Sequence, residues 1–182
     1  TRFGQYAFEL SGGMRQRVLI AIAIACEPDL LIADEPTTAL DVTVQAQILL
    51  LLNDLQRELG MALIMISHDF GVVAATCDRV NVMYGGRIVE HAYTEELFRS
   101  ANHPYTEGLL KLVPSLEQRR GEQLVPISGQ PPDVFNMPPG CSFAPRCPHV
   151  VDLCNEKQPE LTVLGPLHGS ACWMAEQRRL PR

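Results

Sequence analysis

The chain has 182 residues and is 46% hydrophobic, which is enough to bury the core of one ordinary domain, or of a small domain with an appendage. Its formal net charge is −6 at pH 7, and its basic residues are scattered, so the sequence gives no sign of a nucleic-acid-binding surface. The longest apolar runs, 18–26 and 48–52, are well short of the roughly 18 to 20 residues that span a bilayer. Composition therefore excludes a disordered tail, and none of these runs can cross a membrane.

The first patterns are a helix and a strand. Gly12 and Gly13 precede a helical pattern rich in alanine and leucine, and Pro28 marks its end. The next run, 29–36, is apolar up to two adjacent carboxylates, which predicts a buried strand.

The same alternation then repeats. Asp41 is a good N-cap for an amphipathic helix over 42–59, which Gly60 closes. A second apolar run over 61–69 predicts another buried strand and ends in polar residues that include His68. Two further patterns follow, a helix and a β-hairpin with a Gly-Gly turn, over 70–76 and 79–92. This order predicts an α/β fold with a mostly parallel sheet and helices on its faces.

The C-terminal part of the chain has a different sequence pattern from the first part. Two short helical patterns lie within 94–113, and a proline-rich stretch over 114–139 shows little periodicity. Cysteines then concentrate in a segment without long periodic runs, which predicts a small, loop-rich module. We therefore divide the chain into domains 1–92 and 93–182, with the cysteine module at 140–173.

Reactive side chains follow both predicted strands. Asp34 and Glu35 end the first strand and His68 ends the second, and ligands of open α/β sheets collect at such carboxyl ends. One carboxylate can hold a hydrated Mg²⁺ ion while the other orients a water molecule. Ser11 and the two glycines after it begin a helix, whose N–H groups and dipole favour an anion such as phosphate. Glycine there allows close approach of the backbone.

Singly, these features also occur as an ordinary helix cap, a structural histidine or a plain turn. In combination and in this order, they resemble the ATP-binding cassette (ABC) ATPase family of P-loop NTPases, with a signature motif at 10–16, Walker B at 30–35, a D-loop at 39–41 and a switch histidine, His68. The HPYT stretch at 103–106, with the cysteines after it, resembles the C-terminal extension of the oligopeptide and dipeptide importer subfamily. The phosphate-cradling GxxxxGK[ST] loop (Walker A) is not found in these residues. The resemblance thus indicates the C-terminal part of an ABC ATPase domain, followed by a small cysteine-containing extension.

The resemblance implies a role for each matching residue. Asp34 would help to hold Mg²⁺, Glu35 would be the base or water-orienting residue, and His68 would contact the γ-phosphate of ATP. Asp41 would lie at the seam of a head-to-tail dimer with a second, homologous ATPase subunit. The signature helix would serve the ATP of that second subunit through Ser11, Gly12, Gly13 and Gln16.

The implied function is ATP hydrolysis that powers import of dipeptides or oligopeptides, or of nickel or glutathione. Membrane permease subunits, and indirectly an extracytoplasmic solute-binding protein, would be partners at the cytoplasmic face of the inner membrane, and no nucleic acid is expected. Without a Walker A loop the isolated chain is expected to be inactive. Two alternatives remain, a soluble ATPase of the same superfamily without a transporter, and a non-catalytic, metal-bearing fragment.

Four of the six cysteines lie close together, at Cys141, Cys147, Cys154 and Cys172. Cys26 and Cys77 fall in helical patterns and are expected to be small buried apolar residues. No secretory signal opens the sequence, so we expect a reducing compartment, which disfavours disulfides and favours a metal centre. The spacing C-x₅-C-x₆-C-x₁₇-C is wider than the usual zinc pattern. We expect a 4Fe–4S cluster, which the resemblance also implies, with zinc as the alternative and His149 and His168 as substitute ligands.

Overall fold

The computed structural model describes residues 4–113, 126–133 and 135–178. They fall into two compact units, Thr1–Thr76 and Cys77–Arg182. This division lies ahead of the sequence-based boundary at 92/93, because the predicted hairpin pairs with a strand near the C-terminus. Part of the predicted proline-rich linker, 114–125, lies outside the described residues.

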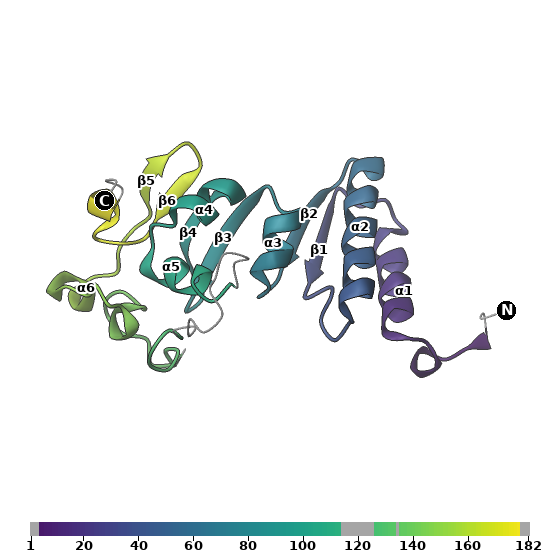
Figure 1. Cartoon of the computed structure of the whole chain (residues 1–182), viewed down its shortest axis with the longest axis horizontal. Helices are drawn as coiled ribbons and strands as arrows, with labels where there is room; N and C mark the ends of the chain where they lie inside the picture. Colours follow the sequence, from purple (N-terminus) through teal and green to yellow (C-terminus); the bar gives the residue numbers. More distant parts are fainter. Residues whose placement is uncertain (1–3, 114–125, 134, 179–182) are drawn as a thin grey trace, which may run out of the picture. The chain divides into compact units, whose positions relative to one another are not determined.

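The first unit alternates helices and strands around one parallel strand pair. Its elements are η2 (Ala7–Glu9), α1 (Gly12–Ile24), β1 (Leu30–Asp34), α2 (Val42–Leu59), β2 (Ala62–Ile66) and α3 (Phe70–Thr76). Strands β1 and β2 run parallel, with Leu30 opposite Ala62 and Asp34 opposite Ile66. Figure 1 shows α1 and α2 side by side next to this strand pair. The helix–strand order predicted for this half is confirmed.

The ends of α2 lie where the sequence predicts them. The Asp41 carboxylate accepts a hydrogen bond from the backbone N–H of Val44 at 3.0 Å, which satisfies one of the N–H groups that a helix start leaves without an internal partner. At the other end Gly60 adopts φ 65°, the left-handed conformation that closes many helices and that glycine adopts without strain.

The core of this unit lies on one face of the two strands. It is formed by residues of α1, β1 and α2 together with the residue that precedes β2, namely Ile20, Leu31, Ala33, Ile48, Leu52 and Met61. Strand residues alternate between faces, so the neighbours of the buried Leu31 point away from this core. Leu30 is 46% exposed and Ile32 is 59% exposed. The prediction of a buried strand therefore holds for only one face of β1 in the described chain.

The second unit is built on an antiparallel sheet. Its elements are β3 (Arg79–Tyr84), β4 (Arg87–Tyr93), α4 (Thr94–Ser100), α5 (Pro104–Leu110), η3 (Ala144–Arg146), α6 (Asp152–Glu156), β5 (Thr162–Gly165), β6 (His168–Ser170) and α7 (Ala175–Arg178). The strand order is β3-β4-β6-β5, with every neighbour antiparallel. The predicted hairpin is confirmed as β3–β4, and its turn has positive φ at both Gly85 and Gly86. The predicted pair of short helices is confirmed as α4 and α5.

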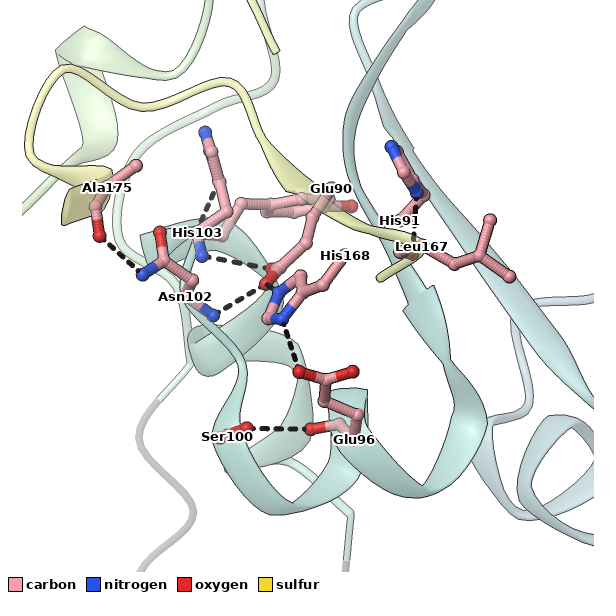
Figure 2. A network of polar contacts seen from close by, with 10 residues as sticks. Glu90, His91, Glu96, Ser100, Asn102, His103, Leu167, His168 and Ala175 are labelled. Atoms are coloured by element: carbon pink, nitrogen blue, oxygen red, sulfur yellow. Dashed lines mark hydrogen bonds and ion pairs between the residues drawn. The ribbon is translucent and has the colours of Figure 1, made fainter. Parts of the chain in front are cut away.

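A buried polar network joins β6 to β4, α4 and the loop before α5 (Figure 2). Glu90 of β4 is fully buried, and its carboxylate accepts hydrogen bonds from the backbone N–H groups of Asn102 (2.6 Å) and His103 (3.0 Å). His168 of β6 lies between two carboxylates, with Nε2 3.0 Å from Glu90 and Nδ1 3.0 Å from Glu96. The start of the HPYT stretch therefore has a structural role, because His103 supplies one of the backbone donors to a buried carboxylate.

Two predictions about cysteines are corrected. Cys26 is exposed and Cys77 is only half-buried, whereas both were expected to be buried. The reason is that α1 ends at Ile24 and α3 ends at Thr76, so each cysteine lies just beyond a helix instead of on its buried face.

Candidate functional site

The carboxyl ends of β1 and β2 meet at one edge of the parallel pair. Asp34 is opposite Ile66, and the backbone N–H of Glu35 donates to the carbonyl oxygen of Ile66 at 2.9 Å. His68 lies two residues beyond Ile66 on the neighbouring segment. Parallel pairing thus brings Glu35 and His68 to the same edge, where the strand pattern places them.

The Glu35 carboxylate contacts two side chains. Its Oε1 atom is 2.7 Å from Nδ1 of His68, and its Oε2 atom accepts a hydrogen bond from the Thr38 hydroxyl at 2.8 Å. Glu35 has φ +47°, in the left-handed region that glutamate seldom adopts. Nothing in the sequence pattern singles out Thr38, apart from its spacing of three residues from a carboxylate.

The contact between Glu35 and His68 shifts the pKa of both groups. The hydrogen bond from His68, and then that from Thr38, holds the pKa of the Glu35 carboxyl below its ordinary value. The hydrogen bond to Glu35 raises the pKa of the His68 imidazole. Each shift favours the charged form, so the two groups form an ion pair at pH values between their pKa values. The site is open to solvent, which weakens the attraction.

The start of α1 is a second candidate site. Ser11 occupies the N-cap position in an extended conformation, and its hydroxyl is exposed and makes no capping hydrogen bond. Gln16 is half-buried within the same helix. A helix of 13 residues has its positive dipole end here, so the Ser11 hydroxyl and the first N–H groups of the helix suit an anion.

The two glycines of this helix start have a packing role. A Cβ atom on Gly13 would lie 2.5 Å from Cγ1 of Val44, and one on Gly12 would lie 3.0 Å from Cδ2 of Leu40. Glycine therefore lets α1 approach the start of α2 and the residues just before it. The approach of an anion to the backbone of these glycines stays a prediction, since within the described chain their neighbours are apolar side chains. Asp41 lies between these neighbours in the sequence and caps α2.

The four clustered cysteines do not form a metal site in the described part of the chain. They are Cys141, Cys147, Cys154 and Cys172, and none of them is in a disulfide. The described residues contain no group of three or more cysteine, histidine, aspartate or glutamate side chains that could hold a metal ion. The backbone N–H of Cys141 donates to the carbonyl oxygen of Cys154 at 2.7 Å, and burial raises the pKa of the Cys141 thiol, which disfavours the thiolate. The described arrangement of these cysteines therefore gives no support to a 4Fe–4S cluster or a zinc site.

The two histidines considered as substitute metal ligands have other contacts. Both ring nitrogens of His168 lie beside carboxylates, those of Glu90 and Glu96. The backbone N–H of His149 donates to Sγ of Cys147 at 3.4 Å.

Two family models match the chain. The model of the oligopeptide/dipeptide transporter C-terminal region matches residues 89–154, and the ABC transporter model matches residues 1–38. The dipeptide transport ATP-binding protein DppD of Bacillus subtilis is 51% identical over 97% of this chain. The oligopeptide transport ATP-binding protein OppD of Salmonella typhimurium is 53% identical over 94% of it. The chain belongs to the ATP-binding proteins of the oligopeptide/dipeptide ABC transporter family.

The chain spans about half the length of the curated relatives it matches, 52% of DppD and 51% of OppD. A solved structure of cbiO1 from Clostridium perfringens, part of the ABC transporter complex cbiONQ, is 41% identical, with a TM-score of 0.47 over 50% of this chain and 36% of that one. Among the described residues, no helix is both long enough and apolar enough to span a membrane.

The family matches include most of the candidate site residues. The ABC transporter match contains segments 10–16 and 30–35, with Ser11 and Glu35, while His68 lies outside both matched ranges. Asp34 is exposed at the carboxyl end of β1, and its carboxylate oxygens are of the ligand type that Mg²⁺ prefers. This donor fits a magnesium-bound nucleotide at the strand edge.

Proposed function

We propose that this chain forms the C-terminal part of an ATP-hydrolysing subunit that powers peptide import across a membrane. The observation that carries the proposal is the pair of Glu35 and His68 at the carboxyl ends of two parallel strands, 2.7 Å apart. A carboxylate held next to a histidine at such an edge suits the orientation of a water molecule and the stabilisation of phosphoryl charge. The peptide cargo is proposed from the names of the relatives, which are dipeptide and oligopeptide transport proteins.

Each residue would act on one part of the reaction. Asp34 would hold Mg²⁺, which supplies positive charge against the β- and γ-phosphates. Glu35 would accept a hydrogen bond from the attacking water and orient it, and His68 would contact the γ-phosphate. The lysine and backbone cradle of a Walker A loop would have to come from residues outside this chain.

The start of α1 would serve a second nucleotide. In a head-to-tail dimer with a homologous ATPase subunit, its first turn would face the ATP of the partner, with Asp41 near the seam. The exposed Ser11 hydroxyl, which does not cap its own helix, supports this role. The residues that would face that ATP are Ser11, Gly12, Gly13 and Gln16.

The remaining partners follow from the same proposal. The subunit would bind membrane permease subunits at the cytoplasmic face of the inner membrane and would act indirectly with an extracytoplasmic solute-binding protein. Nickel and glutathione are further cargo candidates.

Addition of the N-terminal half of a relative tests the proposed activity. We would join the N-terminal half of Bacillus subtilis DppD to this chain, and we refer to the product as the chimera. The chain alone is expected to show no ATPase activity above background, whereas the chimera should hydrolyse ATP. Glu35→Gln in the chimera should reduce hydrolysis by a factor of about 10² to 10⁴, the usual contribution of a general base, and should preserve ATP binding. Glu58→Gln, at an exposed position of α2, is the matched control. Full hydrolysis by the Glu35→Gln chimera would contradict the proposal.

The metal centre stays a separate prediction, without support from the described arrangement of the cysteines. The expected form is a 4Fe–4S cluster on Cys141, Cys147, Cys154 and Cys172, with zinc as the alternative. Anaerobic purification followed by iron, sulfide and zinc analysis tests it. Cys147→Ser combined with Cys154→Ser should abolish the metal content, while the exposed Cys26→Ser should not. Metal retained by the double variant would contradict the assignment.

A further inference from the structure

The turn that follows β1 fixes the backbone of Glu35. The N–H of Glu35 donates to the carbonyl oxygen of Ile66 at 2.9 Å, and its carbonyl oxygen accepts from the N–H of Thr38 at 3.2 Å. With φ at +47°, Glu35 is held in a conformation that the surrounding hydrogen bonds must maintain. The start of the side chain is thus fixed relative to both β2 and the turn.

A fixed backbone does not by itself orient a glutamate carboxylate, because three side-chain torsions remain. The two carboxylate oxygens are held separately. The Thr38 hydroxyl donates to Oε2 at 2.8 Å, and Nδ1 of His68 lies 2.7 Å from Oε1. With Oε2 held from within its own turn, Oε1 faces the neighbouring strand end and His68.

We propose that Thr38 is a positioning residue that holds the Glu35 carboxylate, so that Oε1 keeps its direction when its partner changes from His68 to water. This role rests on the proposed function. In that reaction His68 would leave Oε1 to contact the γ-phosphate, and a water molecule would take its place. The bond from Thr38 does not need to break in this exchange. Misplacement of a catalytic group by about 1 Å can lower the reaction rate by a factor of about 10². A second hydrogen bond that holds the carboxylate should therefore have a measurable effect on the rate.

The acceptor of the Thr38 hydrogen bond distinguishes a role in positioning the Glu35 carboxylate from a role in stabilising the turn. The turn already has its own backbone hydrogen bond between Glu35 and Thr38. The Thr38 hydroxyl instead bonds to a carboxylate oxygen, and Thr38 is itself exposed. Loss of the hydroxyl is therefore expected to leave the fold intact and to release one side of the carboxylate.

The first test follows the His68 imidazole by NMR titration, in this chain and in the chimera. Glu35→Gln defines the titration midpoint of His68 without the carboxylate. Thr38→Val removes the hydroxyl while nearly keeping the size of the side chain. It should shift the His68 titration midpoint part of the way toward the midpoint in Glu35→Gln. Thr38→Ser keeps a hydroxyl and should have the wild-type midpoint. Thr43→Val, at an exposed position of α2, is the matched control. Thr38→Ala replaces the valine variant if circular dichroism shows that the latter is unfolded. A wild-type midpoint in a folded variant that lacks the hydroxyl would overturn the proposal.

The second test measures hydrolysis by the chimera. Thr38→Val should lower kcat about tenfold and leave the KM for ATP unchanged, because the hydroxyl acts only through the Glu35 carboxylate. Thr38→Ser should restore kcat. An unchanged kcat in Thr38→Val would overturn the positioning role. If Glu35→Gln left hydrolysis intact, the proposed function would fail instead, and the titration would still decide whether Thr38 holds Glu35.

Discussion

Replacement of Gly13 by alanine tests the packing of α1 against α2. The added Cβ would lie 2.5 Å from Cγ1 of Val44, whereas carbon atoms in contact are normally about 3.5 to 4.0 Å apart. Valine in a helix has one strongly preferred side-chain rotamer, so Val44 cannot simply turn aside. The two helices must move apart by roughly 1 Å to relieve the contact.

The expected magnitude comes from two opposing effects. Overpacking of this kind costs about 1 to 3 kcal/mol, while replacing glycine by alanine inside a helix gains at most about 1 kcal/mol. With about 2 kcal/mol for the overpacking and a helix gain of up to about 1 kcal/mol, Gly13→Ala should lower the free energy of unfolding by about 1 to 2 kcal/mol. In a Val44→Ala background the clash is absent, and the same substitution should raise the free energy of unfolding by up to about 1 kcal/mol. Gly13→Ala should thus destabilise the wild-type chain and stabilise the Val44→Ala variant.

Urea denaturation provides the assay. Far-ultraviolet circular dichroism follows the helices, of which α1 and α2 are the longest with 13 and 18 residues. The single tryptophan, Trp173, belongs to the other compact unit, and its fluorescence should show an unchanged transition. Gly4→Ala is the control, because a Cβ there would meet nothing within 4 Å. Additive effects of Gly13→Ala and Val44→Ala would refute the reasoning.

Three further outcomes are expected. The ion pair of Glu35 and His68 should stabilise the fold most between their ordinary pKa values of 4.5 and 6.5. Its contribution should disappear as pH falls through the lowered pKa of Glu35 or rises through the raised pKa of His68. The difference in unfolding free energy between the wild-type chain and Glu35→Gln should therefore follow a bell-shaped curve against pH. A difference that does not change with pH would exclude the ion pair. Glu90→Gln removes the charge from a fully buried carboxylate and should cost about 3 kcal/mol, measured by Trp173 fluorescence during urea denaturation, whereas the exposed Glu95→Gln should cost little. Gly140→Ala would place a Cβ 2.2 Å from the carbonyl oxygen of Cys154 and should lower the stability of the second unit by about 2 kcal/mol; an unchanged fluorescence transition would contradict this close approach.

Local signals predicted the elements that depend on local physics. The α2 helix has both of its caps in the sequence, because an aspartate that accepts a backbone N–H and a glycine that adopts positive φ act within a few residues of each helix end. The β3–β4 hairpin is encoded in the same way by its Gly-Gly turn.

The candidate site was predictable in part. Asp34, Glu35 and His68 were placed at one edge because parallel strands end on the same side of a sheet, and the register of β1 and β2 agrees with this. The bond from Thr38 was not predictable, since many hydroxyl groups lie three residues from a carboxylate without contacting it. That contact depends on the left-handed backbone at Glu35, which no residue-type preference indicates.

Sequence alone determined the helix and strand order up to α5 and the turn and cap residues, because these are encoded in residue types at short spacings. Only the tertiary structure decided which faces are buried and which distant groups meet. The apolar run of β1 predicted a buried strand, yet Leu30 and Ile32 are exposed because the core lies on one side of the strand pair. Glu90 gave no sign of burial in the sequence, and His168 was considered only as a metal ligand. They meet because β6 pairs with β4, and a buried carboxylate is tolerated there only when several donors from distant segments surround it.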